Sequence, residues 1–249
     1  MSRWLLLLPL ISACTTVGVV DEPNDPWADA TLRIQQPASG SFLELEDSHE
    51  FLATLTAANG TELSTDGLDI EWTSSVESSW SRQGASFTDD SLDVGLHDIT
   101  AEVVLPNGDR LAHTVGGILL QSRYAGTYSG LFDTQIGFQQ AQANCSGTVT
   151  LIVDPYGRSS TGDATCVASL LGNSTQVHYT FDLTNASGAL DGTAALDLFG
   201  FSGLQFPAQG TLDPDDGTLD VSFDGGPASQ FIAISGTAQA DRTSRDAGL

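Results

Sequence analysis

Apolar and polar residues alternate with a period of two through the first half of the chain, from residue 31 to about residue 122. The clearest run covers residues 68–73, where apolar side chains take every second position up to Trp72. Such a pattern buries one face of a strand and leaves the other in water. The segment Pro106-Asn107-Gly108-Asp109 supplies a hairpin turn, because Asn-Gly tolerates the positive backbone angles that such turns require. The pattern predicts an antiparallel β-sandwich over residues 31–122.

In the second half of the chain, Gly-Thr pairs open short alternating runs. Candidate strands lie near 125–133, 146–153, 163–169, 177–184, 190–198, 205–212, 218–224 and 230–239. Eight antiparallel strands within residues 123–242 are typical of a small closed barrel, which has no exposed edges. Glycine at strand starts would allow the bends that closure needs. A second sandwich and an open meander are the alternatives, and residues 243–249 are predicted to be a disordered polar tail.

The N-terminus begins with Arg3 and an apolar run from Trp4 to Ile11, which is too short for a membrane-spanning helix but fits a secretory signal. The segment Ile11-Ser12-Ala13-Cys14 resembles the lipobox of bacterial lipoprotein precursors. The resemblance implies that residues 1–13 are removed and that Cys14 carries lipid, whereas a plain secretory signal with an incidental cysteine is the alternative. Residues 14–30, with two prolines, are predicted to form a flexible tether. Thr15 is not the aspartate that commonly signals inner-membrane retention, so the resemblance implies an outer-membrane lipoprotein.

Two further segments resemble known domains. The strand Glu71-Trp72-Thr73-Ser74, the segment Leu92-x-x-Gly95-x-His97 and the Asn-Gly hairpin are similar to Ig-like and PKD-like domains of bacterial surface proteins. The chain departs from PKD domains because it lacks their Asp-Gly pair after the tryptophan strand. Residues 235–242 resemble the ends of barrel domains in bacterial surface lipoproteins that bind host proteins. These resemblances imply an extracytoplasmic, all-β binding protein.

The charge of the chain is strongly negative. It contains eight arginines, no lysine and 32 acidic residues, which gives a formal net charge of −24. Such a surface repels nucleic acid, whose binding depends on cations that neutralise phosphates. It also disfavours electrostatic binding to anionic lipid head groups. Solubility is one explanation of this high negative charge, and a role in cation binding is the alternative.

The three cysteines agree with an oxidising compartment. If Cys14 is lipidated, Cys145 and Cys166 remain as an even pair that can form a disulfide. In the chain-entropy model, the bridge would stabilise the folded state by about 3 kcal/mol, because it closes a loop in the unfolded chain.

No segment carries a recognisable catalytic, metal or cofactor motif. His49-Glu50 begins like a zinc-protease motif, but residue 53 is alanine and the segment is a predicted strand. His97 is predicted to pair near Ile118, too far from His113 to share a metal, and therefore to be a structural histidine. Asp213-Pro-Asp-Asp-Gly217 resembles a calcium loop but fits a hairpin turn better. We therefore expect no metal, no cofactor and no enzymatic activity.

Two segments are candidate binding surfaces. Trp80 lies in a serine-rich stretch and could stack on a sugar, or its ring could cover the end of the sandwich. Phe199, Phe201 and Phe206 could form an exposed docking lip, which we favour, or plug one end of the barrel.

The sequence thus predicts a lipid-anchored, non-enzymatic binding or adhesion module of the outer membrane, with a protein or glycan ligand and no nucleic-acid partner. A structural spacer without a specific ligand is the alternative, and an uncharacterised hydrolase ranks third.

Overall fold

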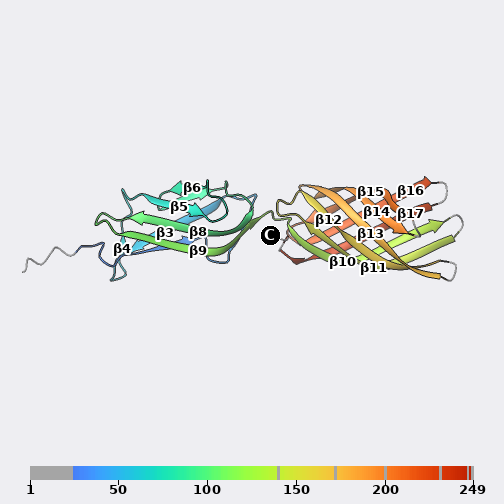
Figure 1. The fold of residues 1–249 in the computed structure, drawn as a ribbon, viewed down its shortest axis with the longest axis horizontal. Helices are drawn as coiled ribbons and strands as arrows, with labels where there is room; N and C mark the ends of the chain where they lie inside the picture. The colour runs from blue at the N-terminus through green and yellow to red at the C-terminus, as the bar shows by residue number, and fades with distance from the viewer. Residues whose placement is uncertain are drawn as a thin grey trace, which may run out of the picture.

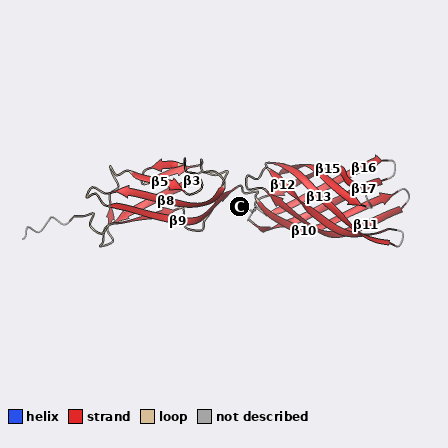
Figure 2. Ribbon diagram, in the orientation of Figure 1, coloured by secondary structure: helices blue, strands red, loops and turns tan. Residues whose placement is uncertain are grey.

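The computed structural model describes residues 25–138, 141–170, 173–198, 201–229, 232–245 and 247. Figure 1 shows two all-β domains end to end, and Figure 2 shows that the regular elements of the described residues are strands. The predicted signal segment, Cys14, most of the tether and Phe199 lie outside the described residues.

The first domain consists of two sheets. One contains β1 (Thr31–Gln36), β3 (His49–Thr56), β4 (Glu62–Leu63) and β7 (Ser86–Asp89). The other follows the order β2 (Phe42–Glu44), β9 (Arg110–Gln121), β8 (Gly95–Val104), β5 (Ile70–Ser74) and β6 (Ser81–Gln83). The predicted sandwich is confirmed with one correction: β2 pairs with β9 in parallel. Alternation along a strand could not reveal this pairing, because it carries no information about strand direction.

Aromatic side chains hold the two sheets together. Trp72 is fully buried and meets Phe51 edge-on, with ring centroids 5.8 Å apart. Phe87 stacks on Phe51 at 5.0 Å. His97 pairs with Ile118 in the β8–β9 ladder and is also fully buried. Its Nε2 donates to the carbonyl of Asp93 (2.9 Å) and its Nδ1 accepts from the Ser74 hydroxyl (2.7 Å), so the predicted structural role of His97 is confirmed.

The second domain is a closed, antiparallel, eight-stranded barrel in which each strand pairs with the next and the last pairs with the first (Figure 1). Its strands are β10 (Gly126–Phe138), β11 (Ala141–Val153), β12 (Ser159–Leu170), β13 (Asn173–Ala186), β14 (Ala189–Leu198), β15 (Phe201–Asp213), β16 (Thr218–Ser229) and β17 (Ile232–Ser244). The barrel prediction is confirmed, and the second sandwich and the open meander are wrong. β17 also extends into the stretch predicted to be a disordered tail.

Glycines on the inner face allow the strands to bend around the barrel. A Cβ on Gly130 would lie 2.0 Å from the carbonyl oxygen of Gln239, and one on Gly147 would lie 1.9 Å from that of Thr165. No side chain fits at these positions, so the strands can approach each other closely only at glycine. The prediction that Gly-Thr pairs open the strands is therefore wrong for several of them: those at 147–148, 192–193, 210–211 and 236–237 lie inside strands.

The junction between the domains is built from polar contacts around the segment that joins β9 to β10. The Arg123 guanidinium lies 3.1 Å from Glu44 and 3.2 Å from Asp47. The guanidinium of Arg245, beyond β17, lies 4.4 Å from the centroid of the Phe42 ring. The two domains therefore contact each other through both ends of the barrel sequence.

Candidate functional site

The barrel interior is filled by side chains. Phe132, Tyr179 and Phe223 lie at its centre, with the rings of Phe132 and Phe223 stacked at 5.8 Å. The Tyr179 hydroxyl donates to Thr134 Oγ1 (2.9 Å), which in turn donates to the carbonyl of Ser235 (3.0 Å). Burial raises the pKa of Tyr179 to about 12, against a smaller opposite effect of the Thr134 hydrogen bond. The inward-facing side chains thus form the core, and the outward-facing ones form the surface of the barrel.

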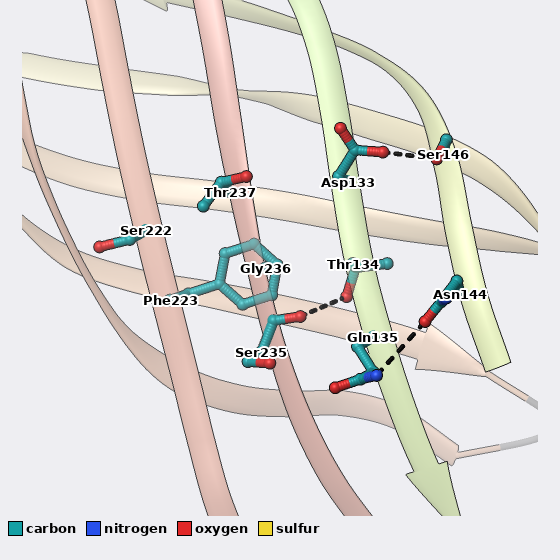
Figure 3. Close-up of a pocket in the computed structure, with 10 residues that line it drawn as sticks. All are labelled: Asp133, Thr134, Gln135, Asn144, Ser146, Ser222, Phe223, Ser235, Gly236 and Thr237. Atoms are coloured by element: carbon teal, nitrogen blue, oxygen red, sulfur yellow. Dashed lines mark hydrogen bonds between the residues drawn. The ribbon is translucent and has the colours of Figure 1, made fainter. Parts of the chain in front are cut away.

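A hollow of about 630 Å³ lies on that outer face, across β16, β17, β10 and β11 (Figure 3). Its lining consists of Asp133, Thr134, Gln135, Asn144, Ser146, Ser222, Phe223, Ser235, Gly236 and Thr237. Most of these side chains are exposed and polar, whereas Thr134 and Phe223 belong to the barrel core beneath. The hollow is therefore a shallow depression in which polar side chains surround apolar surface from the core, and not an entrance to the interior.

The register of the barrel brings these residues together. Ser222 pairs with Thr237, Thr237 with Asp133, and Asp133 with Ser146, so one row crosses four strands. The Ser146 hydroxyl donates to the Asp133 carboxylate, and Gln135 Nε2 donates to Asn144 Oδ1 (3.4 Å) (Figure 3). All of these positions point outward, because the alternating residues between them fill the core.

A second hollow, over β15, β16 and β17, shares Ser222 and Thr237 with the first. Two exposed apolar side chains stand near the edge of this polar area. Leu131 on β10 is 67% exposed and Val167 on β12 is 61% exposed. Both take outward-facing positions on the barrel.

The chemistry of this surface suits recognition. Hydroxyl, amide and carboxylate groups can donate and accept hydrogen bonds, and the lining pairs the Ser146 hydroxyl with the Asp133 carboxylate but contains no histidine. Within the described residues, no group of three or more His, Cys, Asp or Glu side chains is arranged to hold a metal ion.

The structure decides between the two interpretations of Trp80. Trp80 is 2% exposed and packs against Phe51 at 5.4 Å, while its Nε1 donates to the Asp89 carboxylate. Burial of Asp89 opposes ionisation, but hydrogen bonds from Trp80, Arg82 and Ser91 outweigh it and lower the pKa of Asp89. The ring therefore covers the end of the sandwich, as the second interpretation expected, and is not available to stack on a sugar.

Phe206, one of the three phenylalanines of the predicted lip, is also buried. It is 2% exposed and belongs to the barrel core, where its ring lies against the backbone of Gly225. Phe206 therefore cannot act as an exposed docking residue. Phe201 begins β15, but the placement of its side chain lies outside the described residues, as does Phe199.

The other candidate residues have local partners. His49 donates to the carbonyl of Glu44 (2.8 Å), and His113 Nδ1 accepts from the backbone N–H of Ile34 (3.2 Å). His178 Nε2 lies 3.0 Å from the Asp163 carboxylate. The Asp213 carboxylate accepts the backbone N–H groups of the two following aspartates, as in an ordinary turn. The hairpin-turn interpretation of this segment is confirmed.

Sequence reasoning missed the hollow. In the sequence, its serines, threonines and amides are only polar residues at every second position of a strand, and every solvent-exposed strand face has such residues. Only the register between strands that are distant in sequence, such as β11 and β16, shows which of these side chains lie together.

The comparisons with known proteins add little to this geometry. Neither a protein-family model nor a curated protein matches the chain. A solved structure with similarity to it is that of a double mutant of the vaccine antigen transferrin binding protein B from Haemophilus parasuis Hp5. The identity is 10% and the TM-score 0.35, over 78% of this chain and 51% of that protein. The chain thus spans about half the length of that structure, and the likeness is too remote to transfer a function. Within the described residues, no helix has the length and apolar character that a membrane crossing requires.

Proposed function

We propose that the chain is a non-enzymatic binding protein of the cell envelope and that its ligand, a protein or a glycan, is recognised by the outer face of the barrel. The observation that carries the proposal is the hollow across β16, β17, β10 and β11, which lies over a core of buried side chains. A concave surface that combines apolar area with a few convergent polar groups is the usual form of a ligand site.

The proposal includes attachment to the outer membrane through lipid on Cys14. It is supported by the lipobox-like segment and by the Cys145–Cys166 disulfide, which suits an oxidising compartment. On this proposal the sandwich holds the barrel away from the membrane, and the barrel carries the binding surface.

A structural spacer is the second candidate, and the domain junction favours it. Arg123 contacts Glu44 and Asp47, and the Ser122 hydroxyl donates to Glu46, so the domains are joined by more than a single linker. Such a junction is sufficient for a spacer, whereas a binding module requires a ligand in addition.

A screen of protein and glycan arrays with the soluble chain from Thr15 onward separates the two functions. We expect a ligand whose binding is weakened at least tenfold by Thr237→Arg, which fills the hollow. Thr180→Arg, at an exposed position on β13, is the matched control and should bind normally. A chain that binds nothing, or a ligand that both variants bind as well as the wild type does, would refute the proposed site.

A further inference from the structure

The barrel ladder is complete at the end next to the sandwich but has two gaps at the opposite end. The β11–β12 ladder stops at Gly147 paired with Cys166, although both strands continue. The β15–β16 ladder stops at Ala208 paired with Phe223, and those strands also continue. Among the described residues, the barrel therefore divides at this end into two halves of four strands.

Proline explains the gap between β15 and β16. The backbone N–H of Leu212 donates to the carbonyl of Gly188, on the side of β14. Because alternate residues of a strand direct their backbone groups to opposite sides, the backbone groups of residue 207 point toward β16. Residue 207 is a proline, which has no N–H to donate, and the ladder ends beside it. The facing part of β16 carries Pro227. Both edges of this gap thus have the residue that natural sheets use to prevent further pairing.

The gap between β11 and β12 has no such protection. The free parts of its edges, 141–146 on β11 and 167–170 on β12, contain neither proline nor a charged residue. The backbone N–H of Asp154 donates to the carbonyl of Ser159, so the backbone groups of Ser159 point toward β11. Every second residue along β12 points the same way, and these include Val167 and Ser169. β11 leaves the ladder at Gly147, where a Cβ would collide with the backbone of β12, and the Cys145–Cys166 disulfide closes the base of the gap.

Unpaired backbone groups at a strand edge are a template for an added strand. Val167, exposed at this edge, offers an apolar contact for the side chain opposite it on such a strand. The nearby polar surface includes the Asp133 carboxylate. An edge with these features fits an extended peptide segment.

Charge decides which segment fits. Between Gly126 and Ser244 the barrel sequence holds twelve aspartates, no glutamate, no lysine and only Arg158 and Arg242 as cations. Arg242 donates to backbone carbonyls, and the Arg158 guanidinium lies over the Tyr156 ring. A second copy of this chain would bring another net charge of −24 to the edge, so self-association is opposed. A basic segment is attracted.

We propose that the gap between β11 and β12 binds an extended, basic segment of a partner protein, which adds a strand to the edge at Val167–Leu170. This inference rests on the proposed binding function and names the class of partner.

The test uses the soluble mature chain and a blocked heptapeptide of alternating lysine and valine, with binding measured by calorimetry at physiological salt. The same peptide N-methylated at its valines is the control, because it keeps the charge and apolar surface but loses main-chain donors. We expect the N-methylated peptide to bind at least tenfold more weakly, and hydrogen exchange to slow at Val167 and Ser169 when the unmodified peptide is added. Equal binding of the two peptides, or unchanged exchange at these amides, would overturn the proposal.

Two matched variants locate the site. Ser169→Pro removes a free N–H that points toward β11, and Ser174→Pro changes its partner across the β12–β13 hairpin. Both variants lose the same Ser169–Ser174 hydroxyl contact of 3.0 Å. Ser169→Pro should weaken peptide binding at least tenfold and Ser174→Pro should not, whereas equal effects would contradict the assignment. If either variant misfolds, the exchange measurement on the wild type decides alone. An array ligand that depends on Thr237, together with a peptide that leaves the edge unprotected, would refute this inference and leave the proposed function standing.

Discussion

Single backbone positions decide whether this barrel closes. Gly130 and Gly137 lie in the same strand, β10, but their surroundings differ. A Cβ on Gly130 would lie 2.0 Å from a backbone carbonyl oxygen, whereas one on Gly137 would meet its nearest neighbour at 3.5 Å. Inner-face glycines are therefore required by close approach of the neighbouring strand, and outer-face glycines are not.

We predict that Gly130→Ala lowers the free energy of unfolding by about 1–3 kcal/mol, because the strands must move apart to admit a methyl group. Gly137→Ala should leave it within about 1 kcal/mol of the wild type. Urea denaturation of both variants measures the difference. Equal stabilities would show that the barrel relaxes around an added Cβ without cost.

A second residue-scale prediction concerns Tyr179. Burial raises its folded-state pKa to about 12, against 10.0 as the ordinary value. The folded state therefore holds the phenolic proton more tightly, so this contribution to stability is complete below pH 10 and is lost as the pH rises through the folded pKa of about 12. The loss should amount to about 2–3 kcal/mol. In denaturation series from pH 9 to 12, Tyr179→Phe should show a shallower decline than the wild type; parallel curves would contradict the assignment.

At the scale of elements, the disulfide of the described residues joins β11 to β12. Cys145 and Cys166 lie where the ladder ends, with Cα atoms 5.6 Å apart, and both are buried. The predicted bridge between them is confirmed. It joins two strands that lack further hydrogen bonds beyond this point.

Replacing both cysteines with alanine should lower the free energy of unfolding by about 3 kcal/mol, as expected for a loop of this length. It should also increase hydrogen exchange at 141–146 and 167–170 before exchange rises elsewhere. The edges of the β15–β16 gap serve as the internal control. Uniform acceleration over the whole barrel would mean that the bridge stabilises the fold in general and not this gap.

At the scale of the whole molecule, electrostatic contacts join the two domains. The Arg123 side chain is about one-third exposed, so its attraction to the neighbouring carboxylates is weakened by salt. The Arg245 side chain over Phe42 and the bond from the Tyr156 hydroxyl to Asp93 (3.0 Å) add contacts on the same interface.

We expect Arg123→Ala to broaden the distribution of distances between the domains, as measured by small-angle scattering at low salt, without lowering the unfolding temperature of either domain. Arg110→Ala, which removes an exposed pair with Glu102 inside the sandwich, is the control and should have no effect. A distribution unchanged by Arg123→Ala would show that the apolar and backbone contacts suffice.

The attachment of the molecule is predicted to depend on Cys14. Cys14→Ser removes the thiol that would carry lipid, so the protein should move from the detergent phase to a soluble or unprocessed pool in phase partitioning. Unchanged partitioning would refute the lipoprotein proposal.

The sequence by itself determined the local properties of this protein. Alternation and the Gly-Thr pairs predicted eight strands and the barrel, the even pair Cys145 and Cys166 predicted the disulfide, and the position of His97 predicted a buried structural role. Each depends on the residue and its near neighbours along the chain. The parallel pairing of β2, the burial of Trp80 and Phe206, the hollow and the gap beside Val167 were decided only by tertiary structure. Alternation shows on which face a side chain lies, but register between distant strands fixes what it meets, and register is a property of the closed barrel.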